Sequence, residues 1–257
     1  MSLQHVPPRT VKDIERLERV PLPKRLAVGS TYELLQKIVA SSPEQPAHGF
    51  LPFGNPSQPG EALTARAFLG KVHQTANLLA DLGMDPPGVM ALLLPNLLET
   101  HLLLWGGQAV GIVCPIPPFL PTPQIVELLQ TATAKVLVAP APSVDHELWQ
   151  KTEQVRRQVK SIALVLQVRG PGKERDAVYA FNALVEEYPA DRLLTGRQIA
   201  PDDLAVCFPI RDMTGTPGLV PLTHGHLLYT AWALGLVTTL APEEVLLRGL
   251  SRFFRGW

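Results

Sequence analysis

The sequence predicts an α/β fold with a layered, mostly parallel sheet flanked by helices. Short apolar runs, of the length that suits a strand buried on both faces, alternate with longer segments whose apolar residues recur at helical spacing. Helices between consecutive strands supply the right-handed crossovers that a parallel sheet requires. Strands are expected near residues 89–94, 110–114, 135–139, 161–167 and 204–208.

Before the first of these strands, capping residues and residues typical of turns mark where helices and loops begin and end. Residues 31–39 show helical spacing behind Thr31, which we expect to cap the helix. Residues 47–51 fit a strand, and 55–60 fit a loop because they are rich in Pro and Gly. Residues 64–82 form the clearest amphipathic helix, with Gly83 placed to end it.

Later in the chain the same alternation continues. The Pro-rich segment 115–123 is interpreted as a rigid connector rather than a polyproline ligand for another protein. Residues 1–30 are polar and interrupted by Pro, so we expect an N-terminal arm followed by one domain at 31–257. Helices are predicted at 97–108, 124–131 and 179–188.

Composition restricts the classes of function. With 23 basic and 23 acidic residues the formal net charge is zero, so the chain lacks the electrostatic signature of a nucleic-acid-binding protein. The first 20 residues are too charged for a signal peptide. The longest uncharged helical segment, 227–241, is shorter than the roughly 20 residues of a membrane span. We therefore expect a cytoplasmic protein with no membrane span and no nucleic-acid partner.

The two cysteines, Cys114 and Cys207, lie in apolar, strand-like surroundings. Free thiols are expected there rather than a disulfide or a metal site. No His, Cys, Asp and Glu cluster with the spacing of metal ligands is present in the sequence, so no metal-ligating residue is assigned.

A Thr- and Gly-containing loop follows the strand predicted at 204–208 and precedes a long apolar helix. Such a loop presents backbone N–H groups and hydroxyls to phosphate oxygens. We expect it to form the turn between that strand and a helix beginning near Gly225. A surface turn without a ligand is the alternative interpretation. The residues of this loop that keep the phosphate-binding character are Thr214, Gly215 and Thr216.

Residues 208–224 are similar to the ATP-binding signature of the AMP-forming acyl-CoA synthetases, which belong to the adenylate-forming superfamily. That signature reads approximately Thr-Ser/Gly-Gly-Thr-Thr-Gly-x-Pro-Lys, followed shortly by a His. Gly218 replaces the Lys, and residues 210–213 replace the first half of the signature. The matching residues are Thr214, Gly215, Pro217 and His224. The resemblance therefore implies that the nucleotide-binding residues are Thr214, Gly215, Thr216 and His224.

A second segment, 94–101, resembles the Pro-Asn-x-x-Glu segment of the same family. The likeness runs from about Thr31 to the end of the chain and is best for bacterial fatty-acyl-CoA synthetases. It covers only the front part of their fold. The resemblance therefore implies the N-terminal portion of the adenylate-forming fold, with an incomplete AMP-binding domain at 31–257.

The resemblance also implies a reaction. In this family ATP and a carboxylic acid give an acyl-adenylate and pyrophosphate, with Mg²⁺, and coenzyme A then displaces AMP. The family's Mg²⁺-binding stretch, ribose-binding Asp and C-terminal catalytic Lys have no counterparts here. In the tail at 247–257, Phe254 stands where the family has a His near its acyl site. No catalytic residue is assigned, and the chain is expected to be inactive alone.

Two further residues near the loop, His224 and Arg211, are candidates for a functional role. His224 would either orient the loop or the substrate carboxylate, or cap the helix that begins near Gly225, and capping is favoured. Arg211 offers a charge, although at a different position from the missing Lys.

Three hypotheses about function follow. The chain is the N-terminal portion of an acyl-CoA synthetase, a degenerate non-catalytic relative that binds a partner or an acyl ligand, or a complete enzyme with unusual chemistry. The missing half argues against the third. The expected partners are a complementary C-terminal chain or a second copy, with fatty acid and coenzyme A implied by the resemblance.

Overall fold

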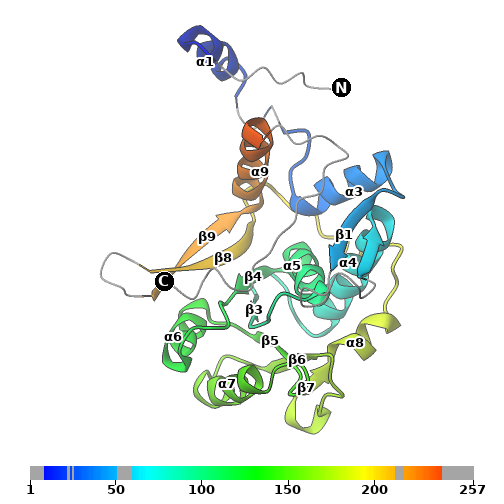
Figure 1. The fold of residues 1–257 in the computed structure, drawn as a ribbon, viewed down its shortest axis with the longest axis vertical. Coiled ribbons are helices and arrows are strands. Elements are labelled where there is room, and N and C mark those ends of the chain that lie inside the picture. Colours follow the sequence, from blue (N-terminus) through cyan, green and yellow to red (C-terminus); the bar gives the residue numbers. More distant parts are fainter. Residues whose placement is uncertain (1–8, 22–23, 25, 51–59, 212–216, 239–257) are drawn as a thin grey trace.

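The computed structural model describes residues 9–21, 24, 26–50, 60–211 and 217–238. Helix α1 (Val11–Glu18) stands apart from the other elements, as Figure 1 shows. It is followed by α3 (Thr31–Ser41) and by a two-stranded antiparallel sheet of β1 (Pro46–Phe50) and β2 (Glu61–Thr64). These elements lie on one side of the main sheet.

The main sheet has seven strands in the order β7-β6-β5-β3-β4-β8-β9. All neighbours in it are parallel except β8 and β9, which form an antiparallel pair at one edge. The expectation of a layered, mostly parallel α/β fold is confirmed. The strands are β3 (Val89–Leu92), β4 (Ile112–Pro115), β5 (Val136–Pro140), β6 (Leu164–Val168), β7 (Val178–Ala180), β8 (Leu204–Arg211) and β9 (Pro217–Thr223).

Helices cover both faces of this sheet (Figure 1). Helices α4 (Ala65–Asp81), α5 (Leu98–Val110) and α8 (Phe181–Leu184) lie on one face, and α6 (Thr122–Ala132) and α7 (His146–Gln158) on the other. Successive strand residues point to opposite faces. In β3, Met90 and Leu92 accordingly join the core on the α4–α5 side, whereas Val89 and Ala91 join the core on the α6–α7 side.

The helix ends show where local sequence rules succeed. Thr64 Oγ1 accepts a hydrogen bond from Ala67 N at 3.2 Å, and Gly83 after α4 has a φ of +81°, as the predicted helix end requires. The predicted cap at Thr31 is wrong by one residue. Ser30 is extended and its Oγ accepts from Glu33 N at 3.1 Å, so Thr31 is the first helical residue.

Other boundaries and elements differ from the prediction. Val110 ends α5, so β4 starts at Ile112. The helix predicted at 179–188 is instead β7, then α8, then a 3₁₀ turn at Val185–Glu187. Helix α7 was not predicted, because only three of its side chains are buried and the rest are mostly polar. Strand β9 was also missed, because Pro217 and Pro221 argue against a strand except at an edge.

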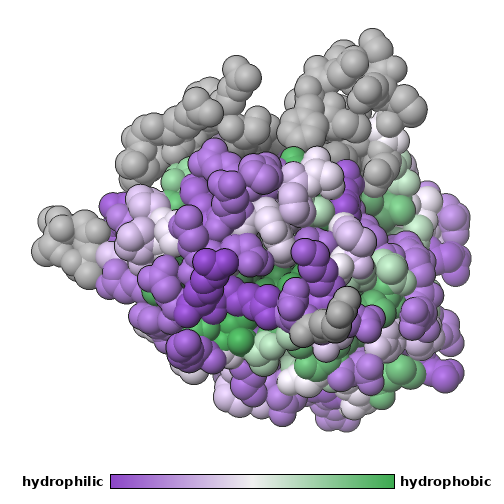
Figure 2. Space-filling model, turned by 90° about the horizontal axis from the view of Figure 1, so that it is seen from below, coloured by the Kyte–Doolittle hydropathy of each residue, from purple (hydrophilic) through white to green (hydrophobic). Residues whose placement is uncertain are grey.

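The face of the molecule at the bottom of Figure 1 is largely hydrophilic. Figure 2 shows it with small hydrophobic areas between charged and polar side chains.

Candidate functional site

The candidate site lies at the β8–β9 hairpin, where β8 continues past the point at which it pairs with β4. Val206 of β8 pairs with Val113 of β4, and the antiparallel ladder with β9 continues as far as Arg211 opposite Pro217. The connection 212–216 includes the predicted phosphate-binding residues Thr214, Gly215 and Thr216, and it lies outside the described residues. The loop was predicted to lead directly into a helix. The structure corrects this, because β9 comes between the loop and α9 (His224–Thr238).

The two faces of the hairpin have different surroundings. Directly paired residues of an antiparallel ladder point to the same face, and neighbours along a strand point to opposite faces. Arg211 is on the face toward α6, where its Nη2 donates to Gln124 Oε1 at 2.5 Å. Gly218 pairs with Ile210 on the other face, and a Cβ at Gly218 would lie 3.7 Å from Ile210 Cγ1. The guanidinium of Arg211 therefore does not occupy the place of a cation at position 218.

His224 is fully buried at the start of α9. Its Nδ1 lies 3.0 Å from Thr31 Oγ1 and accepts from Thr31 N at 3.3 Å. Thr31 Oγ1 in turn donates to Gln108 Oε1 at 2.9 Å. The imidazole thus joins α9 to the first turn of α3 and to α5, three elements that are far apart in the sequence.

The helix cap at α9 is formed by other residues. His226 N donates to Thr223 Oγ1 at 3.2 Å, and Thr223 N donates to His226 Nδ1 at 3.1 Å. This reciprocal pair satisfies the N–H groups of Thr223 and His226, while His224 N and Gly225 N donate to the backbone carbonyls of Asp203 and Pro201. The capping role favoured for His224 is wrong, because its ring is directed into the protein and away from the helix end.

Burial also decides the charge of His224. Desolvation lowers the pKa of the imidazole, and repulsion from Arg197 lowers it further, whereas Asp203 has a weaker raising effect. The resulting pKa is about 4, against an ordinary value of 6.5. His224 is therefore neutral at pH 7, and its Nε2 is buried without a hydrogen-bond partner in the structure.

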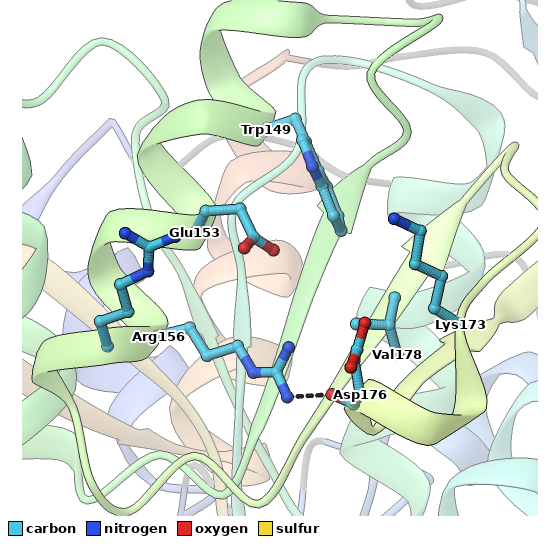
Figure 3. A pocket seen from close by; sticks show the side chains of 7 residues that line it. Trp149, Glu153, Arg156, Lys173, Asp176 and Val178 are labelled. Atoms are coloured by element: carbon cyan, nitrogen blue, oxygen red, sulfur yellow. Dashed lines mark hydrogen bonds between the residues drawn. The ribbon is translucent and has the colours of Figure 1, made fainter.

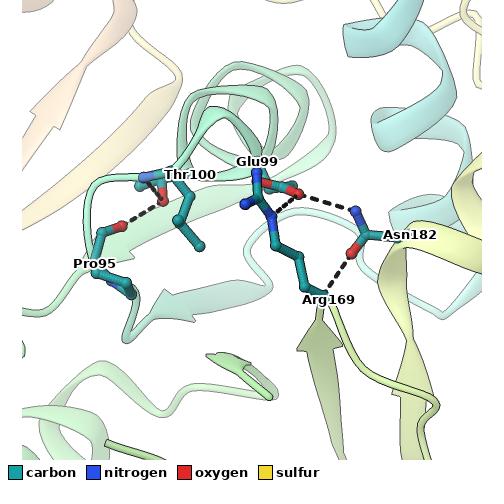
Figure 4. A network of polar contacts seen from close by, with 6 residues as sticks. Pro95, Glu99, Thr100, Arg169 and Asn182 are labelled. Carbon is teal, nitrogen blue, oxygen red and sulfur yellow. Dashed lines mark hydrogen bonds and ion pairs between the residues drawn. The ribbon is translucent and has the colours of Figure 1, made fainter. Parts of the chain in front are cut away.

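The second family-like segment forms a fixed polar network, shown in Figure 4. Arg169, directly after β6, donates from Nε to Glu99 Oε1 at 2.7 Å and from Nη2 to Glu99 Oε2 at 3.0 Å. Asn182 Nδ2 donates to Glu99 Oε1 at 3.0 Å, and Asn182 Oδ1 accepts from Arg169 N at 2.7 Å. The network connects α5, the end of β6 and α8 at the carboxyl edge of the sheet.

This network explains why a carboxylate is tolerated inside the protein. Burial of Glu99 acts to raise its pKa, but hydrogen bonds and charge attraction from Arg169, with help from Asn182, bring the net pKa below its ordinary value. Thr100 completes the turn before it, since its Oγ1 donates to Pro95 O at 2.7 Å (Figure 4). Both carboxylate oxygens of Glu99 accept hydrogen bonds from side chains of the protein, so we assign it a structural role.

The structure also tests the expectations about thiols, metal ligands and membrane spans. Cys114 and Cys207 are both free thiols, as predicted, and burial raises the pKa of Cys114 to about 12. Within the described ranges, no group of three or more His, Cys, Asp or Glu side chains is arranged to hold a metal ion. In the same part of the chain, no helix is long and apolar enough to cross a membrane.

The hairpin and α9 expose apolar side chains to an unusual extent. Phe208 and Ile210, on the Gly218 face of β8, are 41% and 46% exposed. Helix α9 carries no acidic residue in its first turn and no basic residue in its last, and Leu234 is 57% exposed. A helix that is apolar on all sides is normally buried. Apolar surface is therefore concentrated at this end of the described fold.

The chain has a layered, mostly parallel α/β fold with an edge hairpin and a fixed polar network around Glu99, and comparison with known proteins gives its family. A family model for AMP-binding enzymes matches residues 35–254, so the chain belongs to the AMP-binding enzyme family. The resemblance found at 208–224 and 94–101 is thereby confirmed at the level of the family.

Individual relatives agree with this assignment. The chain is 27% identical over 240 residues to the marinolic acid–CoA ligase of Pseudoalteromonas sp. (strain SANK 73390), covering 93% of this chain and 36% of that protein. A long-chain-fatty-acid–CoA ligase from Archaeoglobus fulgidus superposes with a TM-score of 0.71 at 18% identity, covering 83% of this chain and 40% of the other. The N-terminal domain of FACL13 from Mycobacterium tuberculosis gives a TM-score of 0.62 at 20% identity, with 77% and 45% covered. The chain thus corresponds to the N-terminal portion of acyl-CoA ligases and spans well under two thirds of their length.

Proposed function

We propose that this chain is the N-terminal portion of an acyl-CoA synthetase that activates a fatty or other carboxylic acid with ATP. We also propose that the chain is inactive alone. The observation that carries the inactivity is the geometry of the hairpin. The family's Lys position is Gly218, and the neighbouring cation, Arg211, is on the opposite face and bound to Gln124. Among the described residues of the hairpin, no cation therefore lies on the Gly218 face, where this family's Lys would stabilise the negative charge that develops on the phosphate.

The residues proposed to hold the nucleotide phosphates are Thr214, Gly215 and Thr216, through backbone amides and hydroxyls. His224 is proposed as a supporting residue, because its contacts with Thr31 fix the base of the hairpin. ATP supplies the adenylyl group in this family's reaction. No step is assigned to a metal ion on residues of this chain.

An assay of pyrophosphate release tests the inactivity. The purified chain is incubated with ATP, Mg²⁺ and a panel of fatty acids, and acid-dependent release is measured. Loss of one well-placed charged or hydrogen-bonding group typically lowers kcat by a factor of about 100 to 1,000. We expect no release above background, and acid-dependent release by this chain alone would refute the proposal.

A second candidate function is favoured by the apolar surface at β8, β9 and α9. Here the chain acts as a non-catalytic family member that binds a partner or an acyl ligand. A complementary C-terminal polypeptide is the partner that we propose first, and a second copy of the chain is the alternative. Exposed apolar patches of this kind mark association surfaces.

The oligomeric state separates these partners. Sedimentation velocity of the purified chain, from micromolar to tens of micromolar, would show a concentration-dependent dimer if the surface pairs with itself. We expect a Phe208→Ser/Ile210→Ser double variant to abolish any such dimer without loss of the fold. We also propose a boundary near residue 30, between an N-terminal arm (1–30) and an AMP-binding domain (31–257).

A further inference from the structure

A cleft of about 500 Å³ lies between α7 and the turn that precedes β7. Strands β7 and β9 are at opposite ends of the sheet's strand order, so this cleft is far along the sheet from the β8–β9 hairpin. Its size falls within the range of small-molecule sites in proteins, about 300–1,000 Å³. It is lined by Trp149, Glu153, Arg156, Arg157, Lys173, Asp176 and Val178.

The cleft follows from the way α7 meets the edge of the sheet. Leu148, Thr152 and Val155 form the buried stripe of α7. Trp149, Glu153 and Arg156 are spaced four and three residues apart, so they form the adjacent stripe on the same helix. Strand β7 is only three residues long, so that adjacent stripe is not covered by a further strand.

The opposite wall is a short turn closed by backbone pairing. Lys173 and Val178 form an isolated antiparallel bridge, and the 3₁₀ turn Glu174–Asp176 lies between them. A guanidinium nitrogen of Arg156 donates to the backbone carbonyl of Asp176, which joins the two walls (Figure 3). Buried Val178 lies at the base. The cleft is therefore held by backbone structure on one side and by a helix on the other.

The side chains that face the cleft combine an aromatic ring with charges. Figure 3 shows the Trp149 indole and the Lys173 ammonium on two sides of the space, with the Glu153 carboxylate directed toward it. The lining carries three cations, Arg156, Arg157 and Lys173, and two carboxylates. Within the part of the chain that the structure describes, neither Arg157 nor Lys173 forms an ion pair with a carboxylate. Two positive charges thus remain available to a ligand.

We propose that this cleft binds a nucleoside monophosphate or a ligand of the same chemistry, namely a flat heteroaromatic ring joined through hydroxyl-bearing carbons to a phosphate. The ring lies against the Trp149 indole, because every base offers a π-face to an aromatic side chain. The phosphate contacts Lys173 and Arg157. Glu153 accepts hydrogen bonds from ribose hydroxyls or ring amino groups, which a purely anionic ligand would not offer. This site is separate from the hairpin loop and does not depend on ATP binding there.

The test is a titration of the full, ¹⁵N-labelled chain with AMP, followed by NMR shifts of the Trp149 indole N–H and of backbone amides at 173–178. Adenosine and inorganic phosphate are titrated separately. We expect saturable AMP binding with shifts at both walls, and binding at least fivefold weaker for adenosine and for phosphate alone. Trp149→Ala and Lys173→Ala should each weaken AMP binding at least fivefold. Trp149→Phe should retain most of it, because the ring remains.

Two controls keep the result specific. Lys37→Ala removes an exposed cation from α3, on the other face of the sheet, and should leave AMP affinity unchanged. Gly218→Lys alters the hairpin and should leave the Trp149 shifts unchanged. The proposal is overturned if AMP shifts appear only near the hairpin, or if no shifts occur at either wall by 10 mM AMP. It is also overturned if Lys173→Ala and Trp149→Ala both bind AMP like the parent chain, or if phosphate alone saturates the cleft as well as AMP does.

Discussion

The carboxyl edge of the sheet contains two regions that differ in how their charged side chains are paired. Around Glu99, a buried carboxylate has a bidentate partner in Arg169 and a further donor in Asn182. At the β8–β9 hairpin, Gly218 has no side chain and the nearby Arg211 donates to Gln124. The Glu99 region thus has a buried ion pair fixed by three side chains, whereas the hairpin carries its described cation on the face toward α6. If Gly218 stands at the family's Lys position, as we propose, substitutions in the first region should affect stability and substitutions in the second should affect phosphate binding.

Packing shows the same contrast. The side chains of β3, β4, β5 and β6 are buried on both faces of the sheet, whereas β8 exposes Phe208 and Ile210. The central strands are covered by helices on each side, and the outer part of the hairpin has α6 on one face only. Mutations in the first region should lower stability, and mutations in the second should alter binding or association.

The largest effect is expected at the Glu99 network. Arg169→Met leaves the Glu99 carboxylate buried without its cationic partner, with Asn182 still donating to it, and such a change typically destabilises by about 3–5 kcal/mol. Urea unfolding at pH 7 measures it. Without Arg169 the pKa of Glu99 in the folded state rises above its ordinary value, so the deficit should shrink as the pH falls and the carboxyl binds a proton.

Glu99→Gln is the matched control for that variant. It removes the buried charge while keeping an acceptor for Asn182, and it leaves Arg169, whose side chain is 34% exposed, accessible to water. We expect a smaller loss than for Arg169→Met. Equal losses in the two variants, both independent of pH, would show that packing rather than the ion pair holds this edge together.

The next effect concerns His224 and pH. Its pKa is lowered to about 4 in the folded state from 6.5, so the unfolded chain binds a proton at this site first as the pH falls. The stability that the neutral imidazole supports is fully present above about pH 6.5 and is lost progressively between pH 6.5 and 4. The shift corresponds to roughly 3 kcal/mol at most, at 1.36 kcal/mol per pKa unit.

Unfolding free energies at pH 7.5, 6 and 4.5 measure this loss. His224→Asn retains an acceptor toward Thr31 but does not titrate, so its stability should vary less over this range than that of the parent chain. A parallel pH dependence in both proteins would mean that other groups, such as the carboxylates, account for the loss.

A moderate effect is expected from restoring the cation. Gly218→Lys introduces a side chain without strain, because the nearest atom to its Cβ would be Ile210 Cγ1 at 3.7 Å. We expect ATP binding, millimolar or weaker in the parent chain, to strengthen about tenfold, which is about 1.4 kcal/mol. Isothermal titration calorimetry measures it, and Gly218→Met, of similar length without charge, should bind like the parent chain. Micromolar binding by the parent would show that another cation already serves the loop.

The smallest effect is expected on the exposed face of the hairpin. Phe208→Ser replaces a ring that is 41% exposed, so the free energy of unfolding should change by less than about 1 kcal/mol. Ala76→Ser, at a fully buried position of α4, is the contrasting variant, and it should destabilise more because it places a hydroxyl in the core. A large loss for Phe208→Ser would show that the ring is an essential part of the fold.

The sequence determined the α/β class, the parallel order of apolar strands with helices between them, and the family, because these depend on local periodicity and on short motifs. It also located the strands at 89–94, 135–139, 161–167 and 204–208 to within a few residues. It did not reveal α7, whose apolar stripe is too narrow to stand out from its polar residues, or β9, whose prolines are tolerated only because it is an edge strand.

Only the tertiary structure decided what several individual residues do. Local sequence favoured a capping role for His224, but its partner is Thr31, which is 193 positions away. The assignment of Glu99 to an ion pair with Arg169 and the separation of Arg211 from position 218 likewise depend on strand pairing and on contacts between distant segments. Periodicity and capping rules act over one or two helical turns, whereas a buried polar side chain must find its partner wherever the fold brings one.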